Sequence, residues 1–126
     1  MAVLDTSFLI DLERERPSAL KRLKALEADG VPLRVPPATW IEYLARLDPP
    51  RRAAVQKEME SSTFFEPLGR EMADQAVRLQ AELSQRGKPM GWHDLQIAAA
   101  ALFLREPLVS NDGVFHQVPG LEVLDH

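Results

Sequence analysis

The stretch that decides the fold is Gly91-Trp92-His93-Asp94-Leu95-Gln96-Ile97-Ala98-Ala99-Ala100-Ala101-Leu102-Phe103-Leu104. After Asp94 its only polar residue is Gln96, and a helix that is apolar nearly all round must be packed on both sides. The stretch therefore predicts a buried central helix with a carboxylate at its start. Asp94 has two interpretations: an ordinary N-cap, since Asp is a preferred capping residue, or a functional acid held at the floor of a cleft.

The bulk composition is that of an ordinary globular domain. The chain has 126 residues, of which 45% are hydrophobic and 27% are charged. We therefore expect one domain over residues 1–126, with a hydrophobic core that needs no disulfide or structural metal to be stable. The absence of cysteine excludes disulfides and thiolate metal sites and favours a cytoplasmic protein. No apolar run is long enough for a signal peptide or a membrane span, so no membrane partner is expected.

The net charge of −4 argues against a protein that binds nucleic acid through bulk positive charge. It does not exclude one whose acids are gathered at a metal site, because a bound cation inverts the local electrostatics.

Short apolar segments alternate with helical ones along the chain, which predicts a parallel sheet between two layers of helices, a three-layer α/β/α sandwich. We expect Pro67 to place the third strand near an edge of the sheet. Ile41 and Leu44 should point inward from their helix, as should Val77 from a later one. The expected strands are 2–5, 33–35, 63–68, 107–110 and 121–124, and the expected helices are 8–12, 18–28, 38–47, 51–61, 70–86 and 94–104.

Four acids lie at the borders of these apolar segments. Asp5 ends the first strand, and Asp112 comes two residues after the strand that ends at Ser110. Asp94 begins the buried helix, and Glu42 has apolar neighbours on both sides. In open parallel sheets the working groups collect just beyond the carboxyl ends of the strands, so one cleft can collect all four acids.

Crowded carboxylates repel one another and need a compensating positive charge. No Lys or Arg is an obvious buried partner, and oxygen-only ligands favour Mg²⁺ or Mn²⁺. The three histidines lack the ligand spacing of a zinc site. A hard divalent cation holds phosphate oxygens and lowers the pKa of a bound water, which suits phosphodiester hydrolysis.

Each acid also has an ordinary structural explanation. Asp5 can cap the following helix, Asp112 can belong to an Asn-Asp-Gly turn, and Glu42 can be an exposed helix residue. We interpret Asp11 as a solvated residue and leave it out of the candidate site. Agreement among four separate acids favours the functional interpretation.

Four motifs follow one another along the chain. They are Val3-Leu4-Asp5-Thr6-Ser7-Phe8-Leu9-Ile10-Asp11, Trp40-Ile41-Glu42, His93-Asp94-Leu95-Gln96-Ile97-Ala98-Ala99, and Leu108-Val109-Ser110-Asn111-Asp112-Gly113-Val114-Phe115 with Val118-Pro119-Gly120-Leu121-Glu122-Val123. In order and spacing this set resembles the acidic motifs of PIN-domain proteins. The size is most similar to the VapC-type toxins of toxin–antitoxin pairs.

The resemblance implies a five-stranded parallel sheet in a three-layer α/β/α fold. It also implies an endoribonuclease that depends on Mg²⁺ or Mn²⁺ and cuts RNA, a homodimer, and a cognate antitoxin protein that occludes the site.

Carried over position by position, the resemblance implies a set of catalytic acids: Asp5, Glu42, Asp94 and Asp112. It implies direct metal ligation by Asp5, Asp94 and Asp112, whereas Glu42 would act through a water molecule. Thr6 and Ser110 match hydroxyl positions that orient the acids or touch substrate. Ser110 is a small departure, because the family often has Thr there.

Two other classes of protein are alternatives. A catalytically idle PIN-like module would only bind RNA or a partner, and retention of all four acids speaks against it. A phosphoacceptor receiver domain has a similar length and sheet, but it needs a Lys after a late strand. Here Ser110 is followed by Asn-Asp-Gly, so the receiver interpretation is weak.

Overall fold

The computed structural model describes all 126 residues, Met1–His126. Five short strands form one parallel sheet in the order β3-β2-β1-β4-β5, which confirms the expected five-stranded parallel sheet and the edge position of β3. β1 is central, with Ala2 opposite Leu33 and Leu4 opposite Val109. The strands are β1 (Ala2–Leu4), β2 (Leu33–Val35), β3 (Phe64–Phe65), β4 (Leu108–Val109) and β5 (Val123–Leu124).

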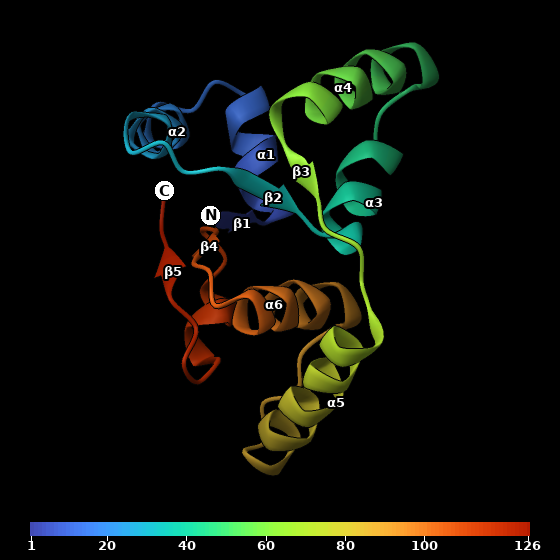
Figure 1. The fold of residues 1–126 in the computed structure, drawn as a ribbon, viewed down its shortest axis with the longest axis vertical. Coiled ribbons are helices and arrows are strands. Elements are labelled where there is room, and N and C mark those ends of the chain that lie inside the picture. The colour runs from blue at the N-terminus through green and yellow to red at the C-terminus, as the bar shows by residue number, and fades with distance from the viewer.

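Helices cover both faces of this sheet, so the α/β/α sandwich is confirmed (Figure 1). α5 and α6 lie on one side, and α1, α2 and α4 lie on the other. None of the helices is both long and apolar enough to cross a membrane. The helices are α1 (Thr6–Glu13), α2 (Pro17–Ala28), α3 (Pro37–Ala45), α4 (Pro49–Ser62), α5 (Arg70–Gln85), α6 (Trp92–Leu104) and the 3-10 helix η1 (Gly113–Gln117).

The alternation of side chains along β1 divides the core into two parts. Val3 points to the side of α5 and α6, whereas Ala2 and Leu4 point to the side of α1 and α2. The apolar run of α6 is buried as expected, including all four consecutive alanines. A small-residue helix can approach the sheet closely, and this places the start of α6 beside the end of β1.

Two expectations about the helices were wrong. Ile41 is 59% exposed and Val77 is 68% exposed. α5 packs instead through Met72, Ala76, Leu79 and Leu83, whose spacing of four, three and four residues makes one stripe that leaves Val77 outside. Pro49 and Pro50 form the first turn of α4, where proline is favoured, and Asp48 accepts a hydrogen bond from the backbone N–H of Arg51.

One charge lies within the sheet and is fully paired. Arg34 in β2 donates to Glu66 at 2.6 Å and to Glu106 at 2.9 Å. The guanidinium therefore bridges two carboxylates, both of which are largely withdrawn from solvent. No comparable cation accompanies the acids at the carboxyl end of β1, as described next.

Candidate active site

The four candidate acids come from elements that meet at the carboxyl end of the central strand. Asp5 directly follows β1, and Asp112 follows the neighbouring strand β4. Glu42 lies on α3, which follows the other neighbour, β2, and Asp94 lies in the first turn of α6. Because α6 contacts both β1 and α3, these elements converge on one edge of the sheet.

The pKa of Asp94 shows that the four acids interact electrostatically. Its pKa is raised from 3.8 to about 6, first by burial and then by the negative charges of Asp5, Asp112 and Glu42. Only His93 acts in the opposite direction. The N-cap of α6 is Gly91, so the interpretation of Asp94 as a simple cap is wrong. The structure thus brings the four acids within electrostatic reach of one another.

Asp5 is held by two hydroxyl groups. It is 4% exposed, and its Oδ2 accepts hydrogen bonds from Ser7 Oγ at 2.8 Å and Ser110 Oγ at 2.7 Å. Both bonds fall on the same oxygen, which leaves Oδ1 for another ligand. Ser110 Oγ also accepts from the backbone N–H of Asp112 at 3.0 Å, so Ser110 connects Asp5 to Asp112.

The hydroxyl that the sequence analysis missed is that of Ser7. The signal was the Asp-Thr-Ser run itself, because a residue two positions after a strand-end Asp can turn back toward its carboxylate. Thr6, which was expected to orient the acids, does not do so here. Its Oγ1 is buried without any hydrogen-bond partner.

The two remaining acids are exposed. Asp112 Oδ1 accepts from the backbone N–H of Val114 at 3.0 Å and caps η1, so the turn explanation holds for one of its oxygens and leaves the other available. Glu42 does not lie between buried neighbours, because both Glu42 and Ile41 face solvent on α3.

The donor set fits a hard divalent cation better than any other metal. All four candidate ligands offer carboxylate oxygens, which suits Mg²⁺ or Mn²⁺. As they stand, no three acidic or histidine side chains are arranged to enclose an ion. Like charges repel one another, and the side chains of Asp112 and Glu42 are exposed to solvent.

Asp11 was wrongly interpreted as solvated. It is buried, and it binds Arg16, Asn111 and His126 at 2.9–3.1 Å. Two of these partners, Asn111 and His126, are at least one hundred residues away along the chain, so the sequence around Asp11 did not indicate them.

A three-layer domain with acids gathered at the carboxyl end of its central parallel strand is the arrangement of a PIN domain. The PIN-domain family model matches residues 2–121, and the chain belongs to this family. PIN domains as a family are nucleases that generally use divalent metals. A comparison with curated proteins by sequence gave no match.

Among solved structures, the chain is similar to the toxins of toxin–antitoxin complexes. VapBC2 from Rickettsia felis bound to a promoter DNA fragment aligns with a TM-score of 0.85 and 19% identity, over 99% of this chain and 98% of that one. DNA-bound VapBC from Salmonella typhimurium gives 0.84 and 22%, over 98% and 96%. VapC20 from Mycobacterium tuberculosis gives 0.71 and 18%, over 98% of both chains. These likenesses establish a common fold.

Proposed function

We propose that this protein is a Mg²⁺- or Mn²⁺-dependent endoribonuclease, the VapC-type toxin of a toxin–antitoxin pair. One observation carries the proposal: the pKa of Asp94 is raised to about 6, first by burial and then by the negative charges of three acids from distant parts of the chain. Folding has gathered negative charge that a divalent cation would neutralise. RNA is the proposed substrate because VapC20, which shares the fold, is named a sarcin–ricin loop cleaving toxin.

In this proposal Asp5, Asp94 and Asp112 hold the ion and Glu42 contacts the attacking water. A divalent ion supplies positive charge to the phosphodiester and acidity to a water molecule. Asp5 is kept in one orientation by its two serine hydroxyl bonds, and Asp94 stands in the first turn of α6, where the helix dipole supports a negative charge. Glu42 is exposed on α3, which suits a bond through a water molecule.

The direct test is RNA cleavage by the purified protein with Mg²⁺, with Mn²⁺, and with a chelator alone. We expect internal cuts with either metal, none in the chelator, and recovery when the metal is added back. Cleavage that continues in the chelator would contradict the proposed chemistry. Binding of Mn²⁺ without cleavage of any RNA would favour an idle PIN-like module.

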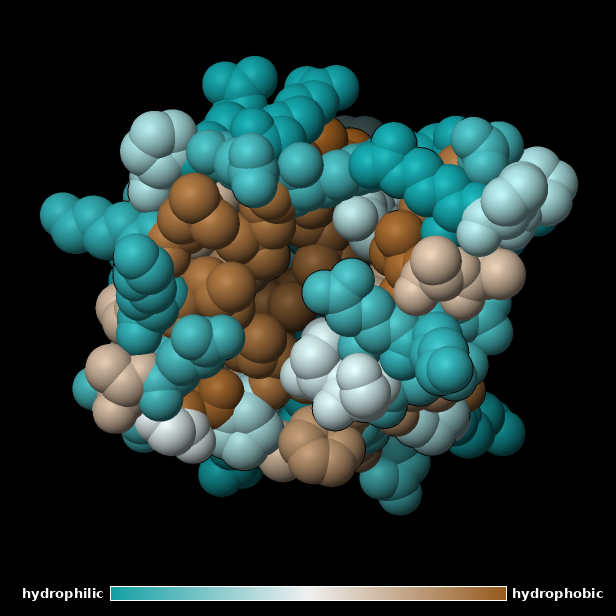
Figure 2. All heavy atoms as spheres, turned by 90° about the horizontal axis from the view of Figure 1, so that it is seen from above, coloured by the Kyte–Doolittle hydropathy of each residue, from teal (hydrophilic) through white to brown (hydrophobic).

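The proposed antitoxin site is an apolar groove between α1, α2 and α4. Figure 2 shows an apolar hollow ringed by hydrophilic side chains on the face that carries these helices. The groove has a volume of about 500 Å³ and a charged rim that includes Glu13, Glu27, Glu58 and Arg51. An amphipathic antitoxin segment would pack its apolar side chains against the floor of the groove and place basic side chains near the acids of its rim. The apolar part of the lining includes Leu9, Leu12, Leu20, Leu23, Val55 and Met59.

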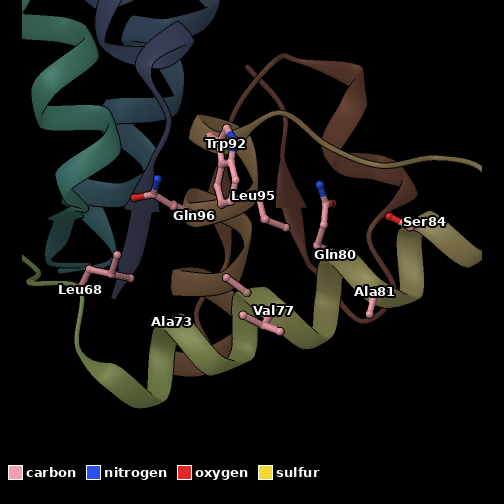
Figure 3. A pocket seen from close by; sticks show the side chains of 10 residues that line it. Leu68, Ala73, Val77, Gln80, Ala81, Ser84, Trp92, Leu95 and Gln96 are labelled. Atoms are coloured by element: carbon pink, nitrogen blue, oxygen red, sulfur yellow. The ribbon is translucent and has the colours of Figure 1, made fainter.

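The proposed homodimer surface lies on the opposite side, between α5 and α6. A groove of about 430 Å³ opens there, lined by Val77 from α5 and by Leu95 and Trp92 from α6 (Figure 3). Trp92 is 78% exposed. A large exposed aromatic side chain beside an apolar groove is typical of an association surface, and a twofold pair of identical chains is the commonest solution.

One charged substitution in each surface should distinguish antitoxin binding from dimer formation. Leu20→Glu, in the groove between α1, α2 and α4, should weaken binding of the cognate antitoxin by about tenfold or more and leave the dimer intact. Val77→Arg should produce a monomer in sedimentation experiments and retain that binding. Each variant is the control for the other, and exchanged phenotypes would contradict the assignment of the surfaces.

A further inference from the structure

Asp11 is a buried carboxylate that lies outside the acidic cluster. It is 8% exposed and lies on α1, six residues after Asp5. Its Oδ1 forms an ion pair with Arg16 Nε at 3.1 Å, and its Oδ2 forms hydrogen bonds with Asn111 Nδ2 at 2.9 Å and with His126 Nε2 at 3.0 Å. The nuclease chemistry described above does not use Asp11.

Asn111 connects this carboxylate to the candidate site. It immediately precedes Asp112 in an exposed turn after β4, and Gly113 follows. The backbone N–H of Asn111 donates to Ser7 Oγ across 3.4 Å, which is a long contact. The side-chain bond to Asp11 is shorter and has a charged acceptor, so it is the stronger of the two.

The two contacts come from one face of α1. Ser7 and Asp11 are four residues apart on the helix, so their side chains are neighbours. Ser7 also donates to Asp5. α1 therefore contacts the carboxylate at the end of β1 and the turn that carries Asp112, and it fixes the separation between them.

We propose that Asp11 and Asn111 form a latch that positions Asp112 for metal binding. Asp112 is exposed, lies in a turn flanked by glycine, and shares its neighbourhood with like charges that would drive it outward. The hydrogen bond from Asn111 to Asp11 opposes that displacement. Asp11 touches neither the ion nor the RNA and is a positioning residue. This inference rests on the proposed function of the protein as a metal-dependent nuclease.

The test is a substitution that removes the latch but leaves the buried carboxylate of Asp11 with other partners. Asn111→Ala deletes the bond to the turn, while Asp11 keeps Arg16 and His126 as partners. The matched control is Arg16→Ala, which removes a partner of the same carboxylate but leaves the turn attached. Mn²⁺ affinity is measured by isothermal titration calorimetry. We expect Asn111→Ala to bind Mn²⁺ about tenfold more weakly, the loss typical of groups that orient metal ligands, and Arg16→Ala to bind it normally.

Cleavage kinetics should show the same difference between Asn111→Ala and Arg16→Ala. For Asn111→Ala, the Mn²⁺ concentration that gives half-maximal cleavage should rise about tenfold, whereas kcat at saturating Mn²⁺ and KM for RNA should stay near wild type. A general loss of stability would lower kcat as well.

Amide hydrogen exchange across residues 111–114 in the metal-free protein tests the latch independently of metal. Exchange should be about tenfold faster in Asn111→Ala and unchanged in Arg16→Ala. Normal exchange and normal Mn²⁺ affinity in Asn111→Ala would overturn the latch, as would an equal loss in Arg16→Ala. If the wild type fails to bind Mn²⁺, the proposed nuclease fails, and the exchange rates still decide whether the turn is held by Asp11.

Discussion

Asp5→Asn is expected to lower metal-dependent RNA cleavage by about 10³-fold, because a metal ligand that supplies several kcal/mol of transition-state stabilisation is worth that factor in rate. Asparagine has nearly the same shape as aspartate, and its side-chain oxygen can still accept the bonds from Ser7 and Ser110. The substitution therefore removes a negative charge and leaves the local packing in place.

The measurement is the rate of cleavage of one RNA at saturating Mn²⁺, with circular dichroism to verify the fold. Asp29→Asn is the matched control, because Asp29 is an exposed acid at the end of α2. It should retain wild-type activity. A folded Asp5→Asn protein that still cleaves at the wild-type rate would remove Asp5 from the mechanism.

Asp94→Asn is expected to abolish cleavage and, at about pH 7.5, to make the metal-free protein more stable than the wild type. The pKa of Asp94 is about 6 in the folded protein and near 3.8 when unperturbed. Between these values the folded state binds more protons than the unfolded state, so the free energy of unfolding falls as pH rises from about 4 through about 6. Above that range the folded protein carries the full cost of an ionised Asp94.

The size of this cost is on the order of 1–3 kcal/mol, since Asp94 is only partly buried and solvent screens its neighbours. It corresponds to a difference of a few degrees in Tm for a domain of this length. Thermal melts in chelator at about pH 4 and about pH 7.5 provide the measurement. The two proteins should converge at the acidic pH and separate at the higher one. Equal melting temperatures at both pH values would show that Asp94 is not under electrostatic stress.

The sequence predicted the sheet and the central helix because those signals are local. Short apolar segments and an all-apolar helix leave few choices for burial, and both were found where expected. The position of Asp5 and Asp112 just after apolar segments also indicated that both acids would lie at the carboxyl ends of strands.

The contacts that hold the acids could not be predicted, because they join residues about one hundred positions apart. The bonds from Ser110 to Asp5 and from Asn111 to Asp11 exist only because β1 and β4 are neighbours. The buried face of α5 was predicted wrongly for a related reason. Val77 fits an apolar stripe in the sequence, but the position of α6 decides which stripe of α5 is buried.

The position of β4 beside β1 also bears on how the protein is made. A ribosome that has finished only the first hundred residues holds a fragment with Asp5, Glu42 and Asp94 but without the strand that brings Ser110 and Asp112 alongside. In the proposed nuclease such a fragment would lack Asp112, one of the proposed metal ligands. Stalled or prematurely released chains of that length would then be unable to cleave RNA.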